Sequence, residues 1–101
     1  MELSKNYLSV YYIGLNDKDK KVQVYNTETC KLIIKGCLKR HAVDGYTMSL
    51  VEGCYKNNTE NTIKIELFNE QLTSDCIIDL EQVLNQECIA EVITSCTINF
   101  I

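Results

Sequence analysis

The side chains able to do chemistry are few, and their spacing does not favour catalysis. His41 is the only histidine, and Cys37 is the nearest cysteine to it. On an extended strand, residues four apart share a face but lie ~13 Å apart, too far for proton transfer between thiol and imidazole. The sequence contains no Gly-x-Ser-x-Gly elbow, His-Glu-x-x-His motif or phosphate-binding glycine loop. We therefore predict a protein that is not an enzyme and that uses no cofactor.

Metal-binding patterns are equally weak. The six cysteines follow irregular intervals and include no Cys-x-x-Cys pair, so the spacing of zinc ribbons and zinc fingers is missing. Asp17, Asp19 and Glu28 match positions 1, 3 and 12 of a calcium loop, but Val22 stands where such a loop requires glycine. The sequence therefore predicts no metal site.

The cysteines also bear on where the protein works. An even number of cysteines in a small chain suits a secreted disulfide scaffold, but the first residues lack the basic start and apolar stretch of a signal peptide. We expect reduced thiols and a cytoplasmic protein, in the host cell's cytoplasm if the chain is viral. Cys37 and Cys54 each lie next to a glycine of the expected hairpin and are expected to approach each other. A redox switch between these two thiols is the alternative to inert ones.

Charge divides the chain into two unequal parts. Residues 1–59 carry a net charge of +3 and residues 60–101 a net charge of −7, which gives −4 for the whole chain. If the acidic side chains share one face, that face would attract a basic partner. The simpler reading is that they are solvated strand and turn residues.

A stripe of basic residues precedes the acidic half. Lys31, Lys35 and Lys39 share a face if this segment is a strand, and a groove that tracks phosphates would use such a stripe. The net negative charge disfavours nucleic acid, and no apolar run reaches the ~18 residues of a membrane span. Binding to another protein remains, since six tyrosines exceed what so small a domain usually buries. The candidate contact residues are Lys35, Lys39, Arg40, His41, Tyr46, Tyr55, Glu87 and Glu91.

The elements that must position these residues are predicted to be strands. Residues 7–15 are rich in tyrosine, valine and isoleucine, and residues 21–26 alternate apolar and polar side chains, so the two segments favour a hairpin. Residues 30–38 also alternate, and residues 62–68 give the clearest alternation in the chain. Six to eight strands follow from this pattern.

The segment from Lys35 to Tyr55 is predicted to be the central hairpin. Asp44-Gly45 suits a type I′ turn, which needs positive φ at both central residues. In that register Gly36 lies opposite Gly53, which indicates a bend or bulge shared by both strands.

The C-terminal third is less clear. Ser74 is a suitable cap for a helix over residues 74–87, but Cys76, Ile78 and Leu80 alternate as a short strand would. We favour the strand, followed by a helical turn near residues 81–85. Residues 88–100 alternate throughout and predict a long final strand.

Together these patterns predict one mainly β domain over residues 1–101. It would be a small antiparallel sandwich or barrel of six to eight strands, with at most one short helix near residues 75–87. We identify no family motif. The expected function is that of a small non-enzymatic binding protein acting through protein–protein contacts, such as a phage- or virus-encoded inhibitor or an immunity-type protein. The alternatives are an oligomeric virion or tail subunit and a small-ligand-binding β-barrel.

Overall fold

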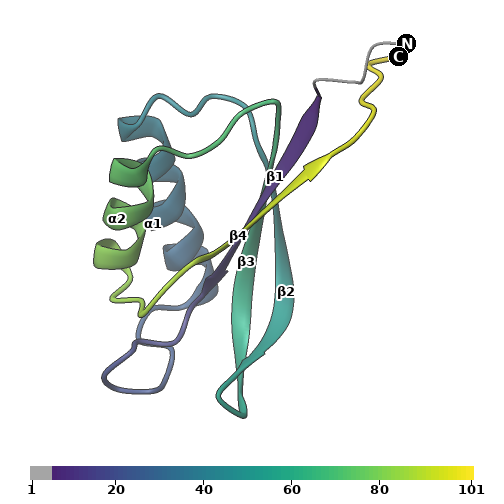
Figure 1. Cartoon of the computed structure of the whole chain (residues 1–101). Coiled ribbons are helices and arrows are strands. Elements are labelled where there is room, and N and C mark those ends of the chain that lie inside the picture. The colour runs from purple at the N-terminus through teal and green to yellow at the C-terminus, as the bar shows by residue number, and fades with distance from the viewer. Residues whose placement is uncertain (1–5) are drawn as a thin grey trace.

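The structure, a computed structural model, describes residues 6–101 and has two layers, a four-stranded antiparallel sheet and two helices packed on one face of it (Figure 1). In chain order the elements are β1 (Tyr7–Gly14), α1 (Thr27–Arg40), β2 (Thr47–Tyr55), β3 (Asn58–Phe68), α2 (Ser74–Val83) and β4 (Ala90–Ser95). The strand order in the sheet is β2-β3-β1-β4, so β1 pairs with both β3 and β4. This order is the split βαβ arrangement of ferredoxin-like folds.

The core lies between the sheet and the helices. Along β1 and β3 every second side chain points toward the helices, and Tyr11, Ile13, Ile63, Ile65 and Leu67 are all fully buried. The helices contribute Cys30, Ile34, Cys37 and Leu38 from α1 and Cys76 and Leu80 from α2. The strong alternation in residues 62–68 therefore reports a strand with one face on the core.

The prediction of a mainly β antiparallel sheet is confirmed in that coarse form, but its details are wrong. The sheet has four strands instead of six to eight, it is open, and two helices cover one face. A second sheet is not needed, because the helices bury the apolar face that a sandwich would cover with strands.

The largest error concerns residues 27–40, which form helix α1 and not a strand. Asn26 caps this helix, since its side-chain oxygen accepts from the backbone N–H of Thr29 at 2.8 Å, and Glu28 lies in the first turn. The buried residues Cys30, Ile34, Cys37 and Leu38 follow helical spacing, and Lys39 and Arg40 end the helix. The isoleucines and the alternation over a short window favoured a strand, and they concealed the helical spacing of the buried residues.

The central hairpin is displaced from its predicted position. Asp44-Gly45 lies in the loop between α1 and β2, and no glycine among the described residues has positive φ. The hairpin joins β2 to β3 instead, with Lys56 and Asn57 at its turn and φ values of 51° and 64°. These values fit a type I′ turn. The predicted pairing of Gly36 with Gly53 is therefore wrong, because Gly53 pairs with Glu60.

The remaining expectations are partly met. Residues 7–14 form β1 as predicted. Residues 21–26 instead form a loop, which contacts the segment after β1 through an isolated bridge between Asn16 and Gln23 and a hydrogen bond from the N–H of Asp17 to the carbonyl of Val22. Residues 74–83 are helix α2, capped by Thr73, so the helical alternative was the correct one. The last strand is shorter than predicted and covers Ala90–Ser95, with every residue exposed.

The face of the sheet away from the helices has no covering layer in residues 6–101 (Figure 1). None of the helices in these residues is long and apolar enough to span a membrane. The β2–β3 turn lies at one end of this sheet, and the start of β1 and the C-terminus lie at the other (Figure 1).

Candidate functional site

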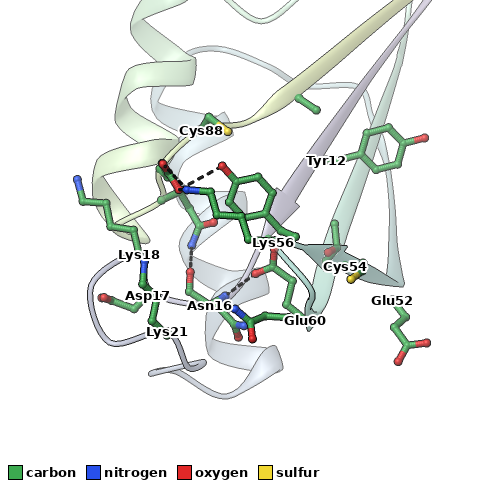
Figure 2. A pocket seen from close by; sticks show the side chains of 18 of the residues that line it. Tyr12, Asn16, Asp17, Lys18, Lys21, Glu52, Cys54, Lys56, Glu60 and Cys88 are labelled. Carbon is green, nitrogen blue, oxygen red and sulfur yellow. Dashed lines mark hydrogen bonds and ion pairs between the residues drawn. The ribbon is translucent and has the colours of Figure 1, made fainter.

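A cavity of about 510 Å³ opens at the hairpin end of the sheet. The ends of β1 and β4, the β2–β3 hairpin, the loop after β1 and the loop after α2 line it. Its volume falls within the roughly 300–1,000 Å³ of pockets that bind small molecules. In Figure 2, Glu60 lies beside Asn16, the loop residues Asp17, Lys18 and Lys21 stand on one side, and Tyr12 stands on the other.

Two glycines give the cavity its floor. A Cβ built on Gly14 would collide with the carboxylate of Glu60, so the absence of a side chain at Gly14 lets that carboxylate lie against the end of β1. At Gly53 a Cβ would meet Oγ1 of Thr62 at 2.5 Å. Neither glycine needs positive φ. At both positions a neighbouring side chain occupies the space that a larger residue would fill, so a substitution would displace Glu60 or Thr62.

Glu60 is held in place from two directions. It lies on β3 opposite Gly53, and its Oε2 accepts a hydrogen bond from the backbone N–H of Asn16 at 3.1 Å. The residue before Asn16 is held as well, since the N–H of Leu15 donates to the carbonyl of Asn61 at 2.9 Å. The carboxylate therefore stands at a fixed place in the cavity.

The hairpin tip is tied to the loop after α2 across the cavity mouth. Oε2 of Glu87 accepts from the hydroxyl of Tyr55 at 3.2 Å, and its Oε1 pairs with Nζ of Lys56 at 3.2 Å. Hydrogen bonding to Lys56, then to Tyr55, lowers the pKa of Glu87. The same contact raises the pKa of Lys56, whose Nζ also lies 5.3 Å from the centre of the Tyr55 ring.

The loop after β1 forms a second wall and is anchored to the loop after α2. The side-chain amide of Asn85 donates to Oδ2 of Asp17 at 3.0 Å, and that of Gln86 donates to the carbonyl of Asn16 at 2.7 Å. The backbone N–H of Lys20 and the amide of Asn85 lower the pKa of Asp17. A charged Asp17 thus helps to keep this wall in one conformation.

The arrangement suits a ligand that carries positive charge and a flat apolar group. Glu60 supplies a fixed carboxylate, and Tyr12 and Tyr55 supply partly exposed aromatic rings on which a purine or a cation can rest. Lys18 and Lys21 line the wall and can meet a ligand carboxylate. No histidine lines the cavity, because the chain's single histidine, His41, ends helix α1.

The structure brings two of the sequence candidates together at this cavity and places the others elsewhere. Tyr55 and Glu87 line it and bond to each other. Glu91 lies on β4 and accepts from the hydroxyl of Tyr11 at 2.6 Å, while Tyr46 packs against the core. The basic candidates Lys35, Lys39, Arg40 and His41 belong to α1 or its end and do not line the cavity.

Sequence reasoning missed the residues that shape the cavity. Gly14, Asn16 and Glu60 form no sequence motif, because Glu60 lies far along the chain from the other two and meets them through the β1–β3 pairing. The signal that could have found them is the turn-rich stretch around residues 57–61, if the hairpin had been assigned there.

The expected approach of Cys37 to Cys54 does not occur. Cys37 is buried in α1, and Cys54 is exposed on β2 and lines the cavity. The predicted separation of ~13 Å between Cys37 and His41 is also wrong. The two residues lie one helical turn apart on α1 and its cap, and not four residues apart on a strand. Their ligand atoms lie within 4.8 Å of each other.

Two solved structures share this fold. A phage SAM lyase in complex with S-methyl-5′-thioadenosine is 21% identical, with 94% of this chain and 85% of that chain covered at a TM-score of 0.61. A phage SAM lyase in its apo state is 22% identical, with 93% and 84% covered at a TM-score of 0.62. No protein-family model matches the chain, and no curated protein matches it.

These similarities correct two sequence-based predictions. We predicted a non-enzymatic binding protein, but both similar solved structures are of a SAM lyase, which is an enzyme. That prediction relied on the absence of catalytic sequence motifs, which does not exclude a site assembled from separate segments of the chain. The expected link to phage agrees with the origin of both similar proteins.

Proposed function

We propose that the chain is a lyase that cleaves S-adenosylmethionine and releases S-methyl-5′-thioadenosine, with the cavity at the hairpin end as its active site. One observation carries this proposal: a ligand-sized cavity with a fixed carboxylate lies in a fold that is shared over 94% of the chain with a phage SAM lyase. The solved structure of that enzyme holds S-methyl-5′-thioadenosine.

The charges of the substrate suit the cavity. S-adenosylmethionine carries a sulfonium, an ammonium group and a carboxylate. Glu60 suits the ammonium group, which keeps its charge throughout the reaction, and Lys18 or Lys21 can meet the substrate carboxylate. Tyr12 and Tyr55 offer ring faces to the adenine. The residues that bind the substrate therefore come from β1, β3, the hairpin and the loop after β1.

The bond to be broken joins sulfur to Cγ of the methionine part. Its electron pair moves to sulfur, so the sulfonium becomes the neutral thioether of S-methyl-5′-thioadenosine. A lyase uses no water, and we propose that the substrate's own carboxylate oxygen bonds to Cγ and closes a five-membered lactone. Closing such a ring requires only that the two ends be held together, and correctly oriented intramolecular reactions gain up to about 7–11 kcal/mol in this way.

The protein then has no proton to move. The negative carboxylate and the positive sulfonium both lose their charge in the step, so a cavity that excludes water lowers the barrier. This fits a site that contains no histidine and whose floor is made of Gly14 and Gly53 beside Val51 and Ala90. The chain's tasks are to fold the substrate, to hold its ammonium group and to exclude water.

The test uses S-adenosylmethionine deuterated at Cβ, with the products identified by mass spectrometry. We expect S-methyl-5′-thioadenosine and a lactone that keeps both deuterium atoms. A product that has lost one deuterium would show that the substrate reacts by elimination and not by ring closure. If S-methyl-5′-thioadenosine forms no faster than in a sample without protein, the lyase function itself is refuted.

A further inference from the structure

A second group of reactive side chains lies between the two helices, and it shares no residue with the cavity. The Sγ atoms of Cys37 and Cys76 and a ring nitrogen of His41 all lie within 4.8 Å of one another. Both thiols are fully buried, whereas the His41 side chain is 23% exposed. The lyase reaction proposed above uses none of these groups.

The helical spacing explains why these side chains converge. Cys37 and His41 are four residues apart at the end of α1, and Cys76 and Asp79 are three apart on α2, so each pair shares one helix face. The two faces meet where α1 packs against α2. Oδ2 of Asp79 crosses this contact and lies 2.9 Å from Nε2 of His41 and 3.3 Å from Sγ of Cys37.

The donor atoms suit zinc. Thiolate sulfur and imidazole nitrogen are the ligands that Zn²⁺ prefers, and such ligands around a tetrahedral ion lie roughly 3.3–3.8 Å apart. The three atoms, already within 4.8 Å, need to move by less than about 1 Å to reach that spacing. Cys37, Cys76 and His41 therefore form a preassembled three-ligand set.

Charge balance also favours this ion. When zinc binds, each of the two thiols loses its proton to solvent, and the two thiolates neutralise the ion, so no net charge is buried. Asp79 does not upset this balance, because the guanidinium of Arg40 pairs with its Oδ2 at 3.1 Å. A carboxylate bonded to a ligating histidine is a common outer partner of zinc, since it fixes the orientation of the ring.

We propose that Cys37, Cys76 and His41 bind one Zn²⁺ ion that joins α1 to α2, with a water molecule as the fourth ligand and Asp79 positioning the imidazole. A disulfide between Cys37 and Cys76 is the competing use of the same thiols. It leaves the convergence of His41 and Asp79 on the same thiol unexplained, since Oδ2 of Asp79 lies within reach of both the His41 ring and Sγ of Cys37.

The test is a titration of the reduced, metal-free full chain with Co²⁺, followed by displacement with Zn²⁺. We expect one Co²⁺ per chain, with thiolate-to-cobalt charge-transfer absorption and the visible bands of a tetrahedral ion. Zn²⁺ should abolish both and raise the midpoint of thermal unfolding, because the metal binds the folded chain. Cys37→Ser, Cys76→Ser and His41→Gln should each remove this uptake, and Asp79→Asn should weaken it about 10- to 100-fold.

Cys30→Ser is the matched control. Cys30 is equally buried in the same helix but lies outside the cluster, so this variant should bind Co²⁺ like the parent chain. His41→Gln changes a partly exposed side chain, so this variant should stay folded even if the substitution of a buried cysteine unfolds the chain. Circular dichroism checks the fold of each variant. The proposal is overturned if the reduced parent chain takes up no Co²⁺ or Zn²⁺, or if folded His41→Gln binds the metal unchanged. Lyase activity is not part of this test.

Discussion

The carboxylate of Glu60 fills the space in which a side chain at Gly14 would stand, and the backbone N–H of Asn16 holds it there. β1 and β3 bring the two residues together from sequence positions 46 apart. The central feature of the cavity is therefore a consequence of strand pairing and of one missing Cβ.

Gly14→Ala should separate the activity of the protein from its stability. The added methyl group displaces the end of a flexible side chain, so the free energy of unfolding should fall by less than about 1 kcal/mol. The displaced Glu60 should raise the KM for S-adenosylmethionine at least about fivefold. Steady-state kinetics and urea unfolding measure the two effects. Gly45→Ala is the control, because nothing lies within 4 Å of a Cβ there, and it should leave both quantities unchanged.

The contact between Glu87 and Lys56 should depend on pH. The folded chain lowers the pKa of Glu87 below its usual 4.5, so the stabilisation is complete above that value and is lost as pH falls through the lower, folded pKa. Carboxyl ¹³C NMR should therefore show Glu87 titrating below pH 4.5. In Lys56→Met the midpoint should move back up, because Lys56 is the main cause of the shift. An unmoved midpoint would show that the hairpin tip does not hold this carboxylate.

Tyr11 ties three parts of the fold together through one buried hydroxyl. The hydroxyl donates to Oε2 of Glu91 at 2.6 Å and accepts from the N–H of Leu72 at 2.9 Å. Burial, followed by the bond to Glu91, raises its pKa to about 12. Tyr11→Phe leaves the Leu72 N–H without its partner and should cost about 1–3 kcal/mol of unfolding free energy. Tyr25→Phe, at an exposed tyrosine, should change it by less than about 0.5 kcal/mol.

Sequence patterns located those strands that have one face on the core. Residues 7–14 were assigned correctly from their content of tyrosine, valine and isoleucine, and residues 62–68 from an alternation that follows burial by the helices. Helix α1 was missed because Cys30, Leu32 and Ile34 alternate over a short window, and only the longer spacing through Cys37 and Leu38 reveals its helical period. Its cap, Asn26, was assigned to the end of the expected strand over residues 21–26.

The sites were less predictable than the strands for a physical reason. Type I′ turns favour Asn-Gly and Asp-Gly, yet Lys56-Asn57 adopts the positive φ values while Gly45 does not. Once that turn is misplaced, Glu60 cannot be assigned to the strand beside β1. In the same way, if residues 30–38 were a strand, Cys37 and His41 would lie far apart. Helix α1 brings their side chains together.

The most direct test of the proposed active site compares S-methyl-5′-thioadenosine release by Glu60→Gln and Glu66→Gln. Both glutamates lie on β3, but only Glu60 lines the cavity. Because Glu60→Gln removes a charged hydrogen bond to the substrate ammonium group, kcat/KM should fall about 10- to 100-fold, mainly through KM. Glu66→Gln should remain within about twofold of the parent chain. Equal rates for both variants and the parent, with all three folded, would contradict an active site in this cavity.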